Sequence, residues 1–291
     1  MKELGFIGGD MRQIRVINEF ARIQREVRIC GFEKAESAEF EDGVKACAEA
    51  EDVIANSRVI ILPLPYTSGR EIINAPYSSK ELHTGDVMRL MKEGQVLLLG
   101  KADEGISAIA KLYGVHFIDY FDREELAVLN AIPTAEGAIE LAMRKTPYTI
   151  HKSRCLILGY GRIGKVLANM LRGIGAQVSV CVRKHKDAAL CRTMGIDAIY
   201  FQNLREKIGD FDIIFNTVPK VVVGYKELKA VRNNSLIIDL ASSPGGVDFE
   251  TAEALKKQAI SALSLPGKVA PQTAGDFIKD TILNILDELG V

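Results

Sequence analysis

The sequence predicts an α/β protein with two domains, each built on a parallel sheet. Short apolar runs alternate with helical patterns along the chain, which is typical of parallel sheets. A glycine-rich turn stands between a strand pattern and a helix pattern near the middle, and the first half opens with a similar unit. The length of 291 residues suffices for two domains. We therefore predict two Rossmann-like domains, linked by a connecting helix, with a cleft between them.

The N-terminal half opens with a strand–turn–helix–strand unit. The apolar run 4–7 predicts a strand, Gly8-Gly9-Asp10 a turn, the spacing over 11–25 a helix, and 27–30 the next strand. Further apolar runs predict buried strands at 59–62, 96–99 and 115–118. The first turn lacks a complete glycine fingerprint, so we assign this half to the substrate and not to a dinucleotide.

A helix follows over residues 133–146. Pro133 stands at its start, where a missing N–H costs little, and Thr134 is a candidate cap. We interpret this segment as the connecting helix between the domains.

The second half repeats the alternation of strands and helices. Apolar runs predict strands at 155–158, 177–182, 212–215, 236–239 and 261–263. A final helix over 273–289 has an apolar face that could pack back on the first domain. We therefore expect a substrate domain of residues 1–131 and 272–291, and a dinucleotide-binding domain of residues 132–271.

The most informative motif is Gly159-x-Gly161-x-x-Gly164, which lies between the apolar run 155–158 and the helix pattern 163–171. In such a motif the first glycine makes a tight turn, the second admits a pyrophosphate, and the third lets helix and strand pack closely. The helix N-terminus adds N–H groups and a positive dipole end. The predicted pyrophosphate contacts are Gly159, Tyr160, Gly161, Arg162, Ile163 and Gly164. The alternative is a structural turn without a ligand.

The predicted strand 177–182 is followed directly by Arg183 and Lys184. At this position an NAD-binding domain typically carries an acidic residue for the ribose 2′-hydroxyl, whereas cations suit a 2′-phosphate. The sequence therefore favours NADP over NAD, and Arg183 and Lys184 are its predicted contacts.

Loops rich in Pro, Gly and small polar residues follow several predicted strands. They span residues 63–69, 216–219, 240–246 and 265–271. Ligands of open parallel sheets lie beyond the carboxyl ends of the strands, so we expect these loops to face one cleft. The predicted contacts near the nicotinamide are Asn216, Thr217, Val218, Pro219, Ala241 and Ser242. For any one loop, the alternative is that these residues only form a turn and bind no ligand.

Candidate catalytic residues are Arg12, Lys268 and Glu136. Arg12 could hold a substrate carboxylate with two hydrogen bonds, or could be a solvated charge at a helix start. Glu136 could be a base or a first-turn charge favoured by the helix dipole. The predicted substrate contacts are Gly8, Gly9, Asp10, Arg12, Thr67 and Ser68. No histidine follows His185, which argues against a 2-hydroxy acid dehydrogenase with a late acid–base histidine.

Composition excludes several classes of protein. The formal net charge of −1 gives no electrostatic footprint for nucleic acid or membrane, and we expect neither as a partner. The five cysteines form no C-x-x-C pair, which indicates reduced core thiols and a cytoplasmic protein. The sequence has no metal-ligand motif, so no metal is expected.

Four longer motifs carry a family resemblance. They are Gly8-Gly-Asp-x-Arg-Gln13, Ile132-Pro-Thr-x-Glu-Gly137, Asp239-Leu-Ala-Ser242 with Pro244-Gly-Gly-x-Asp-Phe249, and Leu265-Pro-Gly-x-Val-Ala-Pro-x-Thr-Ala-Gly275. Together they resemble the A subunit of bacterial dipicolinate synthase, from about residue 4 to residue 286.

The resemblance implies a dehydrogenase component that acts in the mother cell of a spore-forming bacterium and oxidises dihydrodipicolinate to dipicolinate with NADP. It also implies the flavoprotein-like B subunit of dipicolinate synthase as partner, and we expect a homo-oligomer. Two alternatives stay open. One is another NADP-dependent small-acid dehydrogenase, and the other is a non-catalytic cofactor-binding component of a partner enzyme.

Overall fold

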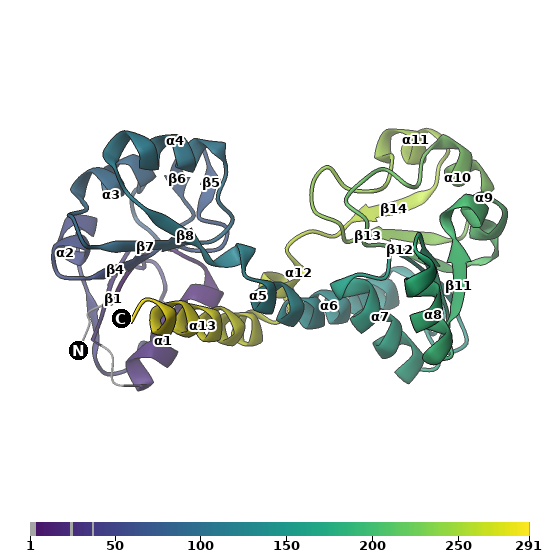
Figure 1. Ribbon diagram of the computed structural model, residues 1–291, viewed down its shortest axis with the longest axis horizontal. Helices are drawn as coiled ribbons and strands as arrows, with labels where there is room; N and C mark the ends of the chain where they lie inside the picture. The colour runs from purple at the N-terminus through teal and green to yellow at the C-terminus, as the bar shows by residue number, and fades with distance from the viewer. Residues whose placement is uncertain (1–3, 24–25, 37, 291) are drawn as a thin grey trace. The chain divides into compact units, whose positions relative to one another are not determined.

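The structure, a computed structural model, describes residues 4–23, 26–36 and 38–290. The chain divides into two compact units (Figure 1). Unit 1 comprises Met1–Leu129 and Ala270–Val291, and unit 2 comprises Asn130–Val269.

Unit 1 is built on a parallel sheet in which the described strands follow the order β3-β2-β1-β4-β7-β8. Their bounds are β1 (Leu4–Ile7), β2 (Val27–Cys30), β3 (Val44–Ala46), β4 (Val59–Ile61), β7 (Val96–Leu99) and β8 (Phe117–Asp119). The strands β5 (Thr67–Gly69) and β6 (Ile72–Ile73) form a separate antiparallel hairpin after β4. This strand order is that of a doubly wound sheet, whose ligands lie at the carboxyl edge.

Helices cover both faces of this sheet. They are α1 (Met11–Arg22), α2 (Ala50–Ala55), α3 (Thr84–Leu90), α4 (Glu104–Tyr113), α5 (Glu124–Leu129) and α13 (Pro271–Glu288), with a 3-10 turn η1 (Tyr120–Asp122). On one face Ile278 and Ile282 of α13 share a buried core with Phe6 and with Phe20 of α1. The chain's last helix therefore completes the hydrophobic core of the N-terminal sheet, because its apolar side chains recur every three or four residues.

Unit 2 repeats the strand order of unit 1, as β11-β10-β9-β12-β13-β14. The bounds are β9 (Arg154–Leu158), β10 (Gln177–Val182), β11 (Asp197–Tyr200), β12 (Ile213–Asn216), β13 (Leu236–Asp239) and β14 (Gln258–Ser261). Every pairing in this sheet is parallel. The carboxyl ends of its strands therefore meet at one edge.

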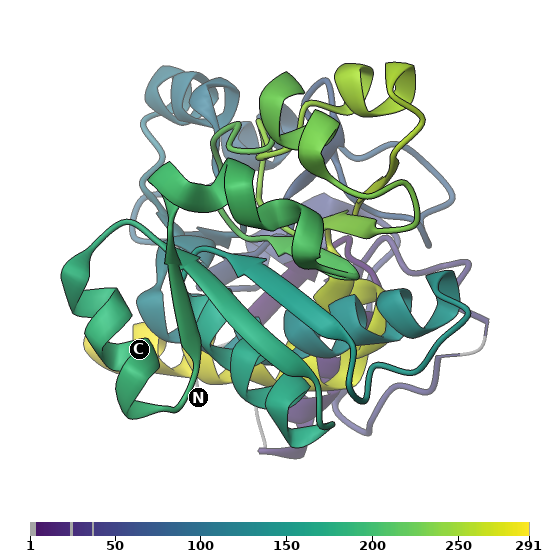
Figure 2. The same cartoon turned by 90° about the vertical axis from the view of Figure 1, so that its right-hand side faces the viewer.

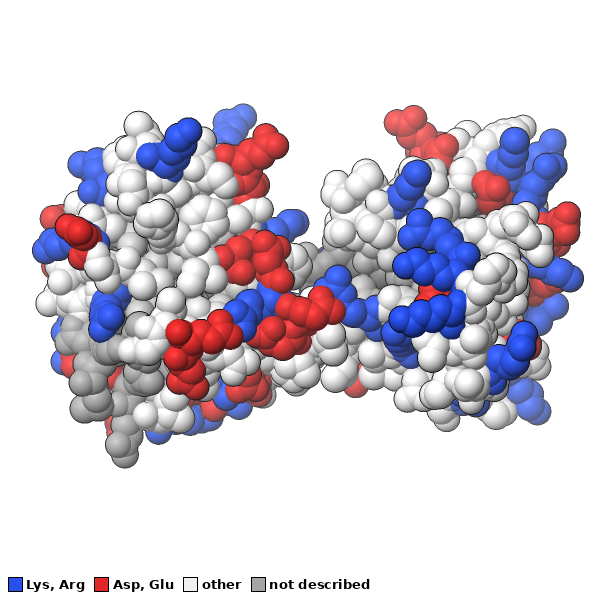
Figure 3. Space-filling model, viewed as in Figure 1, with Lys and Arg blue, Asp and Glu red and all other residues white. Residues whose placement is uncertain are grey.

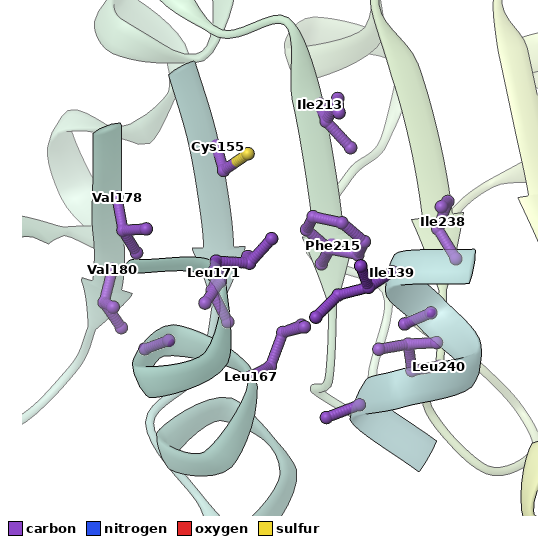
Figure 4. Packing of buried hydrophobic residues seen from close by; sticks show 14 of the residues in the cluster. Ile139, Cys155, Leu167, Leu171, Val178, Val180, Ile213, Phe215, Ile238 and Leu240 are labelled. Atoms are coloured by element: carbon purple, nitrogen blue, oxygen red, sulfur yellow. The ribbon is translucent and has the colours of Figure 1, made fainter. Parts of the chain in front are cut away.

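Helices lie on both faces of this sheet as well (Figures 1 and 2). They are α6 (Ala131–Lys145), α7 (Arg162–Gly173), α8 (His185–Thr193), α9 (Leu204–Lys207), α10 (Tyr225–Ala230), α11 (Phe249–Ala254) and α12 (Leu265–Val269), with 3-10 turns η2 (Phe201–Asn203) and η3 (Ile208–Asp210). Alternate residues of β9 serve the two faces. Cys155 belongs to the same buried cluster as Leu167 of α7 and Ile139 of α6 (Figure 4), whereas Leu156 belongs to the cluster on the other face, with Leu228 of α10.

Several expected boundaries need correction. The described part of the first helix ends at Arg22, and Gln24 and Arg25 of the expected helix lie outside the described residues. The expected strand 115–118 starts two residues later, after a left-handed cap at Gly114. The expected strand 212–215 is observed at Ile213–Asn216.

The last strand and the loop after it were also misplaced. β14 is Gln258–Ser261 and not 261–263, because an edge strand is partly exposed and its sequence need not be apolar. The expected loop 265–271 is instead the short helix α12, followed by Pro271 as the first residue of α13.

The helix expected over 133–146 begins earlier, at Ala131, with Asn130 as its cap residue. Thr134 is not the cap, because it lies within the first turn and its hydroxyl donates to the Asn130 carbonyl at 2.6 Å. By length and composition the helical stretch Glu124–Lys145 could cross a membrane, but half of its most apolar window is buried within the protein. A core helix passes the same test, so this evidence for a membrane span is weak.

Candidate functional site

Four loops meet at the carboxyl edge of the unit 2 sheet, after β9, β10, β12 and β13. The loop after β9 is the glycine fingerprint. Gly159 has φ +97°, a left-handed conformation that side chains rarely adopt. A Cβ atom on Gly161 would meet nothing within 4 Å, so this backbone is open to a ligand. Gly164 has no room for a Cβ atom, because Gly159 O lies 2.3 Å from that point. The three glycines thus occupy the environments that a pyrophosphate-binding turn requires.

The start of α7 is open in a second respect. Its cap residue, Gly161, makes no side-chain hydrogen bond to the first turn. In unit 1 the helix at the corresponding place, α1, is capped by Asp10, whose carboxylate accepts from the Arg12 amide at 3.0 Å. First-turn amides have no partner inside a helix and favour an anion. Unit 1 thus places its own carboxylate where unit 2 leaves room for a phosphate, and the residues of unit 2 fit a dinucleotide.

Arg183 and Lys184 follow β10, the strand paired with β9, and both side chains are exposed. Among the interactions of the described residues, neither takes part in an ion pair with an acidic side chain. A ring nitrogen of the neighbouring His185 lies 2.8 Å from the Tyr200 hydroxyl oxygen. Two exposed cations beside the fingerprint strand are suited to an anionic group.

Charge is distributed unevenly between the units. Unit 1 contains 17 of the 37 Lys and Arg residues and 26 of the 38 Asp and Glu residues, so unit 2 contains 20 and 12. The formal charges are therefore −9 for unit 1 and +8 for unit 2, and Figure 3 shows blue side chains gathered on unit 2. A positive domain attracts a polyanionic dinucleotide over a range of about a Debye length.

The loop after β12 differs from what the sequence suggested. Asn216, expected to contact the nicotinamide ribose, is fully buried, and its amide nitrogen donates to Val218 O and to Asp239 Oδ1. The Thr217 hydroxyl donates to Leu158 O at 2.8 Å. Pro219 is exposed and Val218 is half-buried. The side chain of Asn216 is therefore occupied inside the protein, and this part of the loop offers a ligand Val218 and Pro219.

Asp239 is an organising residue that sequence reasoning missed. Its carboxylate is 2% exposed and accepts from Asn216 Nδ2 at 2.7 Å and from the amides of Ala241, Gly246 and Val247 at 3.1, 2.8 and 3.2 Å. The sequence signals were an acidic residue at the end of an apolar strand, its place in the motif Asp239-Leu-Ala-Ser242, and Gly245 and Gly246 after it. Ala241 is buried in this loop, whereas Ser242 is exposed.

In unit 1 the first turn holds Arg12, which is 8% exposed and so is not a solvated charge. Its Nε and Nη2 donate to the Asp10 carboxylate, with Nη2 to Oδ2 at 2.7 Å, and Nη2 also donates to Leu64 O. The sequence predicted Gly8 as a substrate contact. Its amide is not available for that role, because it donates to Cys30 O at 2.9 Å. Gly9 packs directly against the Gln13 side chain.

The hairpin after β4 holds the other expected substrate contacts. The Thr67 hydroxyl donates to Ile72 O at 2.7 Å and accepts from the Gly69 amide, so it braces the hairpin, whereas Ser68 is exposed. Sequence reasoning missed the neighbouring Tyr66, whose hydroxyl donates to Asp103 Oδ1 at 2.7 Å. Burial and this hydrogen bond raise the pKa of Tyr66.

Glu136 and Lys268 lie on two helices of unit 2, α6 and α12, that pack against each other. A Cβ atom on Gly137 would stand 3.1 Å from the Leu265 Cβ, so the two helices approach each other closely at this glycine. Both candidate side chains are exposed, and Lys268 Nζ donates to Leu263 O at 3.0 Å. The packing brings these two candidates onto neighbouring elements.

Other features of the described residues do not add to this site. A surface hollow of about 440 Å³ is lined by Arg205, Tyr225, Lys226, Lys229 and Ala230, none of which belongs to the fingerprint. No group of three or more His, Cys, Asp or Glu residues in the described ranges could hold a metal ion. All five cysteines are free, and burial raises the pKa of Cys30 to about 11 and of Cys155 to about 12, so these thiols are poor nucleophiles.

Comparison with known proteins assigns both halves of the chain. Residues 3–121 match the family model of the N-terminal domain of the dipicolinate synthase A subunit, and residues 134–265 match the NAD-binding domain of D-isomer specific 2-hydroxyacid dehydrogenases. The dipicolinate synthase A subunit of Bacillus subtilis is 33% identical over 288 residues, which cover 99% of this chain and 96% of the relative.

Solved structures support the same assignment as the sequence matches. The A chain of dipicolinate synthase from Bacillus subtilis superposes with a TM-score of 0.90 at 32% identity, covering 99% of this chain and 97% of that one. The dipicolinate synthase A subunit from Bacillus halodurans gives 0.92 at 29% identity, covering 98% and 97%. An L-alanine dehydrogenase, with a TM-score of 0.70 at 17% identity over 99% of this chain and 90% of its own, shares the fold alone.

Proposed function

Because the chain belongs to the family of dipicolinate synthase A subunits and is a dehydrogenase-type component with a nicotinamide-dinucleotide domain, we propose that it oxidises dihydrodipicolinate to dipicolinate, with NADP as hydride acceptor, during spore formation. The observation that carries the proposal is the similarity to the Bacillus subtilis protein, which extends over both units. A shared dinucleotide domain alone would indicate only a cofactor and a fold.

The cofactor contacts follow from the carboxyl edge of unit 2. The turn Gly159–Gly164 and the uncapped start of α7 would hold the pyrophosphate, through Gly159, Tyr160, Gly161, Arg162, Ile163 and Gly164. Arg183 and Lys184 would hold the 2′-phosphate that distinguishes NADP from NAD. The loops with Thr217, Val218 and Pro219 and with Ala241 and Ser242 would hold the nicotinamide end. When bound, the cofactor supplies the hydride acceptor.

Oxidation of dihydrodipicolinate removes one hydride and one proton and leaves an aromatic pyridine ring. Because aromatisation supplies the driving force, the protein must mainly position the ring and hold two carboxylates. Gly9, Asp10, Arg12, Thr67 and Ser68 are the proposed contacts in unit 1. There the Asp10 pair offsets the charge of Arg12 and fixes its guanidinium.

One group must also accept the proton. Arginine stays protonated in proteins, so Arg12 can donate hydrogen bonds but cannot act as the base. Glu136 and Lys268, on the packed helices α6 and α12, remain the candidates for this role. The name of the Bacillus subtilis relative supports a partner, the B subunit, and we place the reaction in the cytoplasm of the mother cell.

The test is an absorbance assay for NADPH. The purified chain is mixed with NADP and freshly made dihydrodipicolinate precursor, with and without the B subunit, and with NAD as the control. NADPH formation together with dipicolinate supports the proposal, and a signal only with the B subunit makes the chain one part of the catalyst. Tight cofactor binding without turnover in any mixture overturns the proposal in favour of another substrate or a non-catalytic role.

A further inference from the structure

We propose that Asp239 is a positioning residue, whose buried carboxylate fixes the two loops at the nicotinamide end of the cofactor site. The inference rests on the proposed assignment of the loops after β12 and β13 to the cofactor. Asp239 is the last residue of β13 and 2% exposed. Three of its hydrogen-bond donors are amides of the loop after β13, and the fourth is the side chain of Asn216, the last residue of β12, from which the other loop starts. A buried carboxylate without a cationic partner is tolerated only when such donors surround it.

The loop after β13 is folded around this carboxylate. Gly245 has φ +84°, and a Cβ atom there would stand 2.9 Å from Asp239 Oδ2. A Cβ atom on Gly246 would stand 2.1 Å from Asn216 Nδ2 and 2.5 Å from Val218 O. Both positions therefore require glycine, because any side chain would push the loop away from the carboxylate.

Asn216 connects the loop after β12 to the loop after β13. It donates to Asp239 Oδ1 at 2.7 Å and accepts from the Val218 amide at 3.1 Å, which fixes the direction of the chain after β12. The amides of Val222 and Val223 both donate to Gly246 O. The backbone that leads to Pro219 and the backbone that leads to Ser242 are thus held in one hydrogen-bonded network.

Unit 1 indicates that the fold itself does not need this network. By register, the positions of its sheet that correspond to Asn216 and Asp239 are Leu62, directly after β4, and Leu99, the last residue of β7, and both are fully buried and apolar. The same strand order is therefore stable without a buried carboxylate. The buried pair of Asn216 and Asp239 occurs in the unit with the dinucleotide fingerprint, where hydride transfer requires the loops to stay in a fixed position.

Burial also separates Asp239 from acid–base chemistry. Both carboxylate oxygens accept from groups of the protein, and the residue is closed to solvent. Asp239 therefore acts through the loops, and its removal should change cofactor affinity and turnover by displacing Val218, Pro219 and Ser242.

The experiment compares Asp239→Asn with the wild type by calorimetric titration with NADP and NAD and by steady-state kinetics of the full chain with the B subunit. An asparagine places an N–H₂ group against amides that also donate, so the loop must move. We expect the cofactor Kd to rise by about tenfold or more and kcat to fall as well.

A matched control is Asp212→Asn. Asp212 also accepts from a backbone amide, Arg154 N at 2.7 Å, and from Arg232, but it lies at the opposite, amino edge of the sheet. Its variant should lose thermal stability and keep the wild-type cofactor affinity. Equal losses of affinity in both variants would reduce Asp239 to a structural role and overturn the proposal.

A second variant covers the case in which Asp239→Asn does not fold. Asn216→Asp places two carboxylates in contact, so one of them is protonated more readily, and its O–H can then replace the lost N–H donor. The ratio of the variant Kd to the wild-type Kd should fall as the pH decreases from about 8 to about 6. A wild-type Kd in the folded variants overturns the inference alone, whereas a wild type that binds neither NADP nor NAD overturns the proposed cofactor and this assignment with it.

Discussion

The carbonyl oxygen of Gly159 lies only 2.3 Å from the point that a Cβ atom on Gly164 would occupy. No side chain fits there, so the first turn of α7 packs directly against the end of β9. This close approach aims the start of the helix at the carboxyl edge, where a phosphate would bind.

The substitution Gly164→Ala should therefore separate α7 from β9. We expect it to lower the free energy of unfolding by about 2 kcal/mol through overpacking and to weaken cofactor binding by at least about tenfold. Urea denaturation and calorimetric titration with NADP measure the two effects. The control is Gly173→Ala in the same helix, where a Cβ atom meets nothing within 4 Å and helix propensity favours alanine. Unchanged stability and binding in Gly164→Ala would contradict the proposed role of the turn.

The substitution Arg183→Gln should shift preference from NADP towards NAD. Loss of one charge-assisted hydrogen bond to a 2′-phosphate should raise the Kd for NADP about tenfold, while NAD binding stays unchanged. Fluorescence titrations with both cofactors, repeated at higher salt, test this expectation. Arg192→Gln, at the exposed end of α8, is the control and should leave both affinities unchanged. A parallel loss of NAD affinity in Arg183→Gln would show that Arg183 does not read the 2′-phosphate.

The substitution Arg12→Ala should affect stability as well as substrate binding. It leaves the Asp10 carboxylate and Leu64 O without their donor, so we expect a loss of about 3 kcal/mol in the free energy of unfolding. The KM for the dicarboxylate should rise by well over about tenfold, with NADP binding unchanged. Arg22→Ala, which removes exposed and solvent-screened ion pairs from the same helix, should cost much less stability than Arg12→Ala. A stable variant with an unchanged KM would remove Arg12 from both roles.

The stability of unit 1 should depend on the charge of Asp103. Burial raises the pKa of this residue, but hydrogen bonds from the Ile106 amide, the Tyr66 hydroxyl and the Gly105 amide outweigh that effect and lower it overall. A lowered folded-state pKa means that the stabilisation is present above the unfolded value of about 3.9 and is lost as the pH falls through the folded value.

The matched variant Asp103→Asn keeps the cap oxygen and removes the charge. Because Asp103 is exposed to solvent, its advantage over asparagine at neutral pH should be at most about 1 kcal/mol. The difference should stay constant down to about pH 5 and close below about pH 4. Urea denaturation of both proteins across this range measures it. A difference that persisted at the acid end would rule out the charge as its source.

The sequence by itself determined the features that depend on neighbours along the chain. The spacing of Gly159, Gly161 and Gly164 between an apolar run and a helical pattern predicted the dinucleotide turn, because strand, turn and helix are adjacent in sequence. The alternation of strands and helices likewise predicted two parallel sheets, and long motifs were sufficient to predict the family.

Only the tertiary structure decided which distant residues meet. Asn216 and Asp239 are 23 residues apart, and they pair because β12 and β13 are neighbouring strands. Arg12 reaches Leu64 O across 52 residues, so a side chain that could have been solvated is instead buried. Edge strands such as β14 were misplaced, because partial exposure removes the apolar pattern that marks a central strand. Local spacing records backbone conformation, whereas the partners of a buried polar group depend on the strand order, and no local pattern carries that information.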